Sequence, residues 1–168
     1  ATTGESGTGE FSLVVTHKAG GVTLAAISDP SVAESSLLTV TPEVTLSGCA
    51  AGPVNWTAAD LPSGASINSG TGVVSWTPDC TAAENGLGVY GPITVTAHAA
   101  TGETGSASFT VHVTDTPGTV AVAPISDPAV AELALLTVTP EVTLSGCART
   151  PATWTAAGLP AGAAIDAA

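Results

Sequence analysis

Apolar and polar residues alternate along most of this chain with a period of two. Clear examples are FSLVVT at residues 11–16, ITVTA at 93–97 and FTVHVT at 109–114. No segment keeps an apolar stripe with a period of 3.6 residues over three turns, so the pattern predicts strands and almost no helix. About seven short strands per unit, separated by turns every 8–12 residues or so, are typical of a β-sandwich.

Glycine and proline positions divide these strands into pairs. The SGTG turn at residues 69–72 predicts a hairpin between residues 65–67 and 73–77. A second hairpin is expected from residues 93–97 and 107–113, around the turn at 101–105. Pro42 interrupts residues 37–46, which predicts either one long bent strand or two strands, because proline cannot donate to a sheet ladder. Residues 54–58 form a further strand, whereas residues 22–27 and 120–125 read as connectors between units.

The alternating pattern recurs along the chain at a fixed offset of 98 residues. Aligning residues 1–70 with residues 99–168 gives 42 identical positions, and residues 37–50 return unchanged as residues 135–148. The repeat predicts three parts: residues 1–18 as the end of one repeat, 19–116 as a complete repeat and 117–168 as the first half of the next. Arrays of near-copies are typical of long chains that form a stalk or a fibre rather than of single catalytic pockets.

The incomplete repeats at the two ends have two interpretations. The first is that the chain is a segment of a longer tandem array. The second is that the half-repeats complete each other between subunits, as in polymers built by strand donation. The first interpretation is favoured because neither end supplies a counterpart of residues 71–98.

Charge narrows the classes of partner. The chain has 14 acidic residues against two basic ones and a net charge of −12, so it is expected to repel nucleic acid and anionic membranes. No run approaches the roughly 18–20 apolar residues that a membrane helix requires, so no membrane insertion is expected in this segment. With only 10% charged residues, the surface is rich in Thr, Ser, Ala and Gly, which suits close packing against neighbouring copies.

Two cysteines and two tryptophans in the complete repeat are candidate structural residues. Cys49 and Cys80 are expected to form a disulfide that closes a loop of about 30 residues and stabilises the unit by roughly 3–4 kcal/mol. The alternative is two buried thiols. Trp56 and Trp76 are expected in the core, the alternative being a platform on which sugars stack.

Candidate chemistry is sparse elsewhere. Asp29 and Glu34 lie near the predicted boundary between repeats, where carboxylates are weak candidates for a calcium site. Their alternative role is that of solvated charges that discourage edge-to-edge aggregation. No serine, threonine or cysteine has a histidine and a carboxylate at plausible positions for catalysis. The sequence therefore predicts neither an enzyme nor a resident cofactor.

Three segments carry a resemblance to a known family. Residues 61–67 (LPSGASI), 71–78 (TGVVSWTP) and 93–97 (ITVTA) resemble the putative immunoglobulin and dystroglycan-type cadherin-like repeats of bacterial surface proteins. The resemblance covers essentially the whole 98-residue unit. It implies an extracellular or cell-surface, all-β Ig-like or cadherin-like sandwich in tandem. The acidic DxNDN motifs of cadherin calcium sites do not occur in this sequence.

These observations favour a structural protein in which stacked Ig-like domains form a fibre, filament or stalk. The expected partners are copies of the chain itself, end to end or side by side. The alternative is an adhesin, or a carbohydrate-binding accessory or spacer array of a larger secreted protein, with cell-surface glycans as partners.

Overall fold

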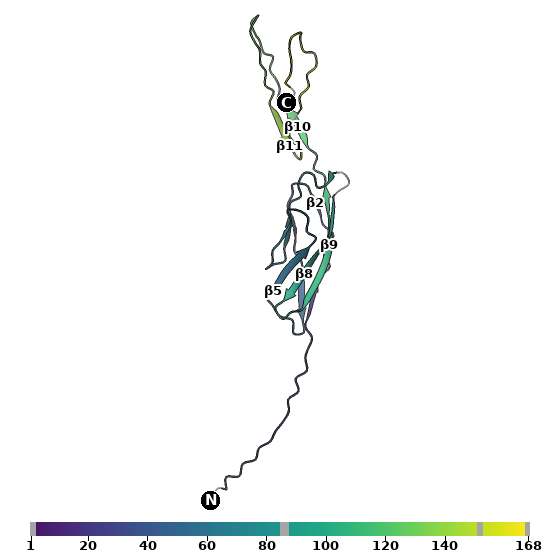
Figure 1. Ribbon diagram of the computed structural model, residues 1–168, viewed down its shortest axis with the longest axis vertical. Helices are drawn as coiled ribbons and strands as arrows, with labels where there is room; N and C mark the ends of the chain where they lie inside the picture. Colours follow the sequence, from purple (N-terminus) through teal and green to yellow (C-terminus); the bar gives the residue numbers. More distant parts are fainter. Residues whose placement is uncertain (1–2, 85–87, 151–152, 167–168) are drawn as a thin grey trace.

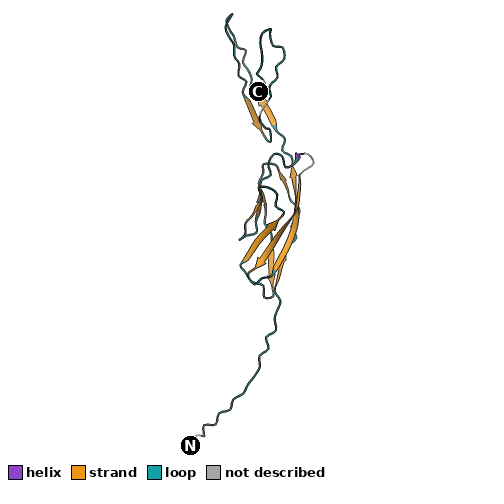
Figure 2. Cartoon of the chain, in the orientation of Figure 1, coloured by secondary structure: helices purple, strands orange, loops and turns teal. Residues whose placement is uncertain are grey.

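The computed structural model contains one complete β-sandwich between two less compact segments (Figure 1). It describes residues 3–84, 88–150 and 153–166. An extended segment enters one end of the sandwich from the N-terminus, and the strands β10 and β11 project from the opposite end. Figure 2 shows strands joined by loops, as the alternating pattern predicts, with one short helical turn that includes Glu84.

Eleven strands are described, nine of which belong to the sandwich. In chain order they are β1 (Gly21–Leu24), β2 (Ser31–Ala33), β3 (Leu38–Val40), β4 (Val44–Ser47), β5 (Val54–Ala59), β6 (Ser66–Ile67), β7 (Val74–Trp76), β8 (Val89–Ala99), β9 (Thr104–Thr114), β10 (Thr119–Val122) and β11 (Val142–Ser145). Pro42 separates β3 from β4, which lie in different sheets.

Two sheets face each other across the sandwich. The larger has the order β2-β9-β8-β5 and the smaller the order β3-β7-β6. The hairpin β8–β9 is antiparallel and contains 11 residues in each strand, and the predicted hairpin β6–β7 forms as well. β2 pairs with β9 in parallel, with Val32 opposite Val113. β2 is thus the edge strand of the larger sheet, next to the point where the chain leaves the unit.

The core lies between these sheets and draws on alternate residues of each strand. Its members are Val32, Leu38, Val40, Trp56, Val74, Trp76, Ala82, Ile93, Val95, Ala97, Phe109, Val111 and Val113. Trp56 and Trp76 are 4% and 5% exposed. The Trp76 ring meets the Tyr90 ring edge to face with 4.7 Å between centroids, and its indole N–H donates to the Ser63 carbonyl at 3.0 Å. Both tryptophans are therefore core residues with most of their surface removed from water.

A third pairing forms at the N-terminal end of each repeat. β1 pairs with β4 in the first repeat, and β10 pairs with β11 in the second, both antiparallel. The registers are equivalent: Gly21 lies opposite Ser47, and Thr119 lies opposite Ser145, each 98 residues later. The predicted connector 22–27 is thus partly a strand, because its first residues find a partner in β4.

The two terminal segments differ from their expected structure. The alternation at residues 11–16 and their alignment with residues 109–114 predict the same strand in both places, yet residues 11–16 are unpaired, and Phe11 is 90% exposed where Phe109 is 2% exposed. β9 pairs with β8, and the 168 residues contain no counterpart of β8 for residues 11–16. The copies of β2 and β3 in the second repeat are likewise unpaired, because no copies of their partners β9 and β7 follow them within the 168 residues.

Candidate functional site

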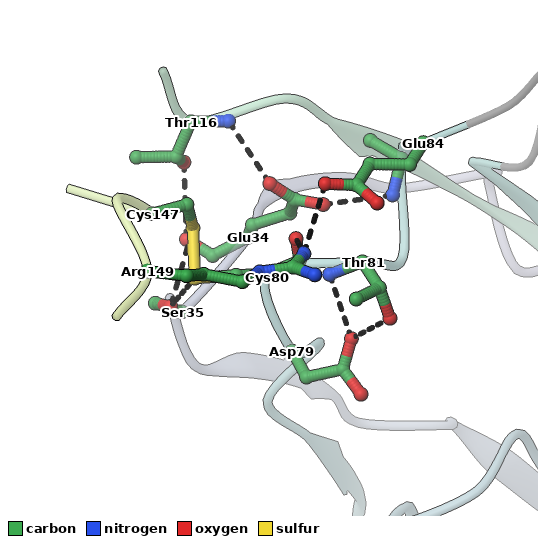
Figure 3. Close-up of a disulfide and its surroundings, with 10 residues drawn as sticks. Glu34, Ser35, Asp79, Cys80, Thr81, Glu84, Thr116, Cys147 and Arg149 are labelled. Atoms are coloured by element: carbon green, nitrogen blue, oxygen red, sulfur yellow. Dashed lines mark hydrogen bonds and ion pairs between the residues drawn. A yellow bond between two sulfur atoms is a disulfide. The ribbon is translucent and has the colours of Figure 1, made fainter. Parts of the chain in front are cut away.

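The most elaborate group of polar contacts lies where the sandwich meets the second repeat. A disulfide joins Cys80, in the loop after β7, to Cys147, in the turn after β11, with 5.3 Å between the Cα atoms (Figure 3). This spacing is ordinary for a disulfide. We call residues 34–35, 79–84, 114–118 and 146–149 the inter-unit joint, because they connect one repeat covalently to the next.

This pairing corrects the prediction made from the cysteine spacing. Cys80 bonds to Cys147 rather than to Cys49, and Cys49 is a free, exposed thiol. The reason is position in the fold: Cys49 follows β4 at the end where the chain enters the sandwich, whereas Cys80 follows β7 at the end where it leaves. The disulfide closes a loop with a sequence separation of 67 and links two repeats instead of stapling one.

Glu34 holds the two loops of the joint together. Its side chain, 1% exposed, accepts hydrogen bonds from the Ala83 backbone N–H at 2.8 Å and from the Thr116 backbone N–H at 3.2 Å. The Thr116 hydroxyl also donates to the Glu34 carbonyl at 3.2 Å. The Ala83 N–H is the main reason that the pKa of Glu34 is lowered; burial opposes this effect, and the Thr116 N–H adds to it.

Residues next to the disulfide complete the joint. The Ser35 hydroxyl lies 3.3 Å from the sulfur of Cys80 and 3.9 Å from that of Cys147. Arg149 donates to the Cys80 carbonyl and to the Glu84 carboxylate, the latter at 2.8 Å. This ion pair is half exposed, so it contributes about 0–1 kcal/mol and serves mainly to orient the loop.

Asp79 shapes the loop that carries Cys80. Its carboxylate accepts from the Thr81 hydroxyl at 2.5 Å and from the Thr81 backbone N–H at 2.8 Å. These two bonds, the hydroxyl first, lower the pKa of Asp79. The side chain thus fixes a local turn directly around the cysteine.

The linker between the repeats is packed rather than free. Gly146 has a φ of +61°, and a Cβ at this position would collide with the Pro117 carbonyl. A Cβ on Gly118 would collide with the backbone of Ala148. The linker and the turn that carries Cys147 therefore lie in direct backbone contact, while the neighbouring Thr116 is hydrogen-bonded to Glu34 of the first repeat.

The remaining candidate residues occupy separate places. The Asp29 carboxylate accepts from the Thr110 backbone N–H at 2.7 Å, and Thr110 lies six residues before the Thr116 that Glu34 contacts. Both carboxylates are thus occupied by backbone donors. Within the described residues there is no group of three or more His, Cys, Asp and Glu side chains that could hold a metal ion. The calcium site stays a prediction.

The described surface pockets contain few ionisable side chains. A pocket beside β3 is lined by backbone and small side chains together with one carboxylate, Glu43. The described residues also contain no helix that is long and apolar enough to cross a membrane.

Comparison with known families agrees with the sandwich just described. A family model for the putative Ig domain matches residues 20–114, which cover β1 to β9. The chain belongs to the putative Ig domain family. This assignment confirms the resemblance and the all-β Ig-like fold that the sequence predicts.

Two further comparisons add little to the Ig-domain assignment. The chain is similar to a crystal structure of a putative alpha-galactosidase from Bacteroides fragilis, with 20% identity and a TM-score of 0.41. The similarity covers 61% of this chain and 19% of that one, so the Ig-like chain spans less than a fifth of the length of the galactosidase. No curated protein sequence matches the chain.

Cys80 and Glu34 could be recognised from the sequence as candidate residues, but the inter-unit joint to which both belong could not. Sharing one repeat makes Cys49 and Cys80 the expected pair, and the sequence indicates no role for Ser35, Thr116 or Arg149. One signal was present: Cys147 is the third cysteine of the chain, 67 residues after Cys80 and in the second repeat, so it was a possible partner for Cys80.

Proposed function

We propose that this chain is a structural segment of an extracellular fibre or stalk, in which Ig-like units are stacked end to end through covalent joints. The observation that supports this proposal most directly is the Cys80–Cys147 disulfide between two successive repeats. A bond between repeats does little for the function of either repeat alone. It limits their relative rotation and separation, which is the property that a stalk or fibre requires.

Other features support the same proposal. The linker is in close backbone contact with the next repeat, and the buried Glu34 bridges the two loops beside it. Disulfides persist in oxidising surroundings, which supports an extracellular or cell-surface location. We propose no catalytic role.

The alternative is an adhesin or a carbohydrate-binding spacer array. Binding of sugars by stacking requires aromatic faces that are open to solvent. Trp56 and Trp76 are buried in the core, which weakens the main sequence argument for this alternative. We therefore keep it as an outcome of the test below.

Electron microscopy of the native material, with no partner added, tests the proposal. Strands of 11 residues make the sandwich about 36 Å long, so a fibre of stacked units shows an axial repeat near that length or a multiple of it. Dispersed short rods that bind immobilised glycans saturably would instead support the spacer or adhesin. Micrographs taken after reduction with dithiothreitol serve as the control, because loss of the joints makes any rods bend.

A further inference from the structure

We infer that Cys49 is one half of a second inter-unit joint, and that its partner is a cysteine equivalent to Cys80 in an Ig-like unit on the N-terminal side of Gly20. This inference rests on the proposed function, since it extends the same covalent joint to the other end of the sandwich. It assigns a disulfide partner to a thiol that is free and exposed in the structure.

In the second repeat, the residue equivalent to Cys49 already forms a disulfide. Cys147 is the copy of Cys49 at the 98-residue offset, within the identical stretch 37–50 and 135–148. Cys147 forms its disulfide with the cysteine of the preceding unit. The same position in the first repeat therefore carries the chemistry that is seen to operate in the second.

The local geometry at Cys49 already matches that at Cys147. Gly48 has a φ of +62°, and Gly146 has a φ of +61°. A Cβ on Gly48 would collide with the Ala19 carbonyl, just as one on Gly146 would collide with the Pro117 carbonyl, and residue 19 is the equivalent of residue 117. The incoming chain thus lies against the cysteine turn in the same way at both places.

The equivalence continues in the turn and in the strands that support it. The Ala50 N–H donates to the Ser47 carbonyl at 3.1 Å, and the Ala148 N–H donates to the Ser145 carbonyl at 3.3 Å. The strand pairs β1–β4 and β10–β11 have equivalent registers. A unit that ends at Lys18, the copy of Thr116, would therefore bring its own Cys80 equivalent next to Cys49.

The sequence before Gly20 indicates that the occupant of this end is an Ig-like unit. Residues 6–16 are the copy of β9, and Phe11, Leu13 and Val15 repeat the buried positions 109, 111 and 113. In the structure these three side chains are 79–90% exposed. Such an alternating apolar strand has the pattern of the last strand of a sandwich, and the sandwich that it would complete lies directly before the Cys49 turn.

The bond forms by oxidation of two thiols. Cys49 and the Cys80 equivalent together lose two protons and two electrons as the sulfur–sulfur bond forms. A small-molecule disulfide such as oxidised glutathione accepts them and is cleaved to two thiols, through a mixed disulfide on one of the cysteines.

The test uses the full chain with residues 19–116 duplicated in tandem, so that Thr116 of the first copy runs into Ala19 of the second and Cys147 still follows the second copy. The chain is refolded in a glutathione redox buffer, and free thiols are counted in denaturant without reduction. With Cys49→Ser in the first copy, every remaining cysteine has a partner across a joint, so we expect no free thiol. With Cys49→Ser in the second copy, the matched control, we expect two.

The opposite counts would overturn the inference, because they indicate a Cys49–Cys80 bond within each unit. Two free thiols in both variants would overturn it as well, because Cys49 then stays free beside a complete unit. Failure here is distinguishable from failure of the proposed function. If native filaments form while Cys49 is unbonded, the proposed fibre stands and this inference fails. If Cys49 is bonded but no filaments form, this inference stands and the proposed fibre fails.

Discussion

Glu34 is a carboxylate at 1% exposure whose partners are mostly backbone N–H groups rather than cations. Charged groups are rarely buried unless their lone pairs are satisfied, and here the bonds from Ala83 and Thr116 satisfy them. Hydrogen bonds from the two loops therefore replace water around the carboxylate and fix its position between them. Its charge state controls whether both loops stay in contact with it.

The pKa of Glu34 is lowered from its ordinary 4.5, so its contribution to stability depends on pH. That contribution is complete above the pKa of the unfolded chain and is lost as the pH falls through the lower pKa of the folded protein. We expect Glu34→Gln to lower the melting temperature at pH 7, and the difference from wild type to shrink at pH 3. Thermal denaturation followed by circular dichroism across this range measures both effects.

Glu132, the exposed copy of Glu34 in the second repeat, provides a matched control. Glu132→Gln makes the same chemical change outside the sandwich and should leave the melting temperature unchanged. Equal effects of the two substitutions would contradict the role assigned to the Glu34 hydrogen bonds.

Gly72 lies against the Trp56 indole in a backbone conformation that favours glycine. Its φ is +76°, and a Cβ would overlap the Trp56 indole. We expect Gly72→Ala to cost about 1–3 kcal/mol of unfolding free energy, because the indole must move in a packed core and the backbone is strained. Gly70→Ala is the control, since its Cβ meets only the Asn68 side chain at 3.5 Å. Urea denaturation of both variants gives the comparison, and equal midpoints would show that the contact with Trp56 is relaxed at little cost.

At the scale of elements, the two copies of one sequence show how far strand formation depends on distant partners. Residues 37–50 and 135–148 are identical, yet the first copy forms β3 and β4 whereas the second forms only β11. β4 and β11 each pair with the first strand of their own repeat, β1 and β10, whereas β3 requires β7. Local pattern specifies which residues face inward, and the partner strand decides whether a strand exists.

The repeat also offers an internal comparison for the energetics of β9. Phe109 is 2% exposed in the sandwich, and its copy Phe11 is 90% exposed. We expect Phe109→Ala to reduce the unfolding free energy by about 3–5 kcal/mol, the range for a buried phenylalanine that leaves a cavity. Phe11→Ala should change it by less than about 0.5 kcal/mol. Chemical denaturation of the two variants checks the difference, and a large loss for Phe11→Ala would mean that residues 11–16 pack against a surface in solution.

Much of the fold was accessible from the sequence for the same reason. Period-two alternation and the glycine turns located β5 to β9, because each of these strands exposes one face to the core and their hairpins are local. The parallel β2–β9 pair and the β1–β4 pair were not foreseen, since each joins segments that are not neighbours in a hairpin. The Cys80–Cys147 bond was missed for a related reason: the end of the sandwich at which a cysteine lies follows from strand order and not from spacing.

At the scale of the whole molecule, the joint determines how the second repeat is held on the sandwich. By the loop-entropy model, a loop of this length is worth about 4 kcal/mol against the unfolded chain. That value is an upper limit here, because breaking the bond also frees the second repeat in the folded state. The disulfide therefore acts more on the orientation of the repeats than on the stability of either one.

We expect reduction, or Cys147→Ser, to cost the sandwich well under about 4 kcal/mol of unfolding free energy. Amide hydrogen exchange should nevertheless become faster in the turn around residues 146–149 and stay slow in β8 and β9. Hydrogen-exchange mass spectrometry with and without reductant measures this pattern. Cys49→Ser is the control and should change neither region, and a sandwich that unfolds on reduction would contradict this account of the joint.

The joint also decides what happens when the two ends of the chain are pulled apart. Tension runs along the shortest covalent path, so it crosses directly from Cys80 to Cys147 through the sulfur bridge. The intervening residues, at a sequence separation of 67, include β8 and β9 and carry no load while the bridge is intact. Fully extended, they would add about 220–240 Å. Each oxidised joint therefore keeps that length in reserve, and the redox state of the surroundings sets how far the chain can stretch.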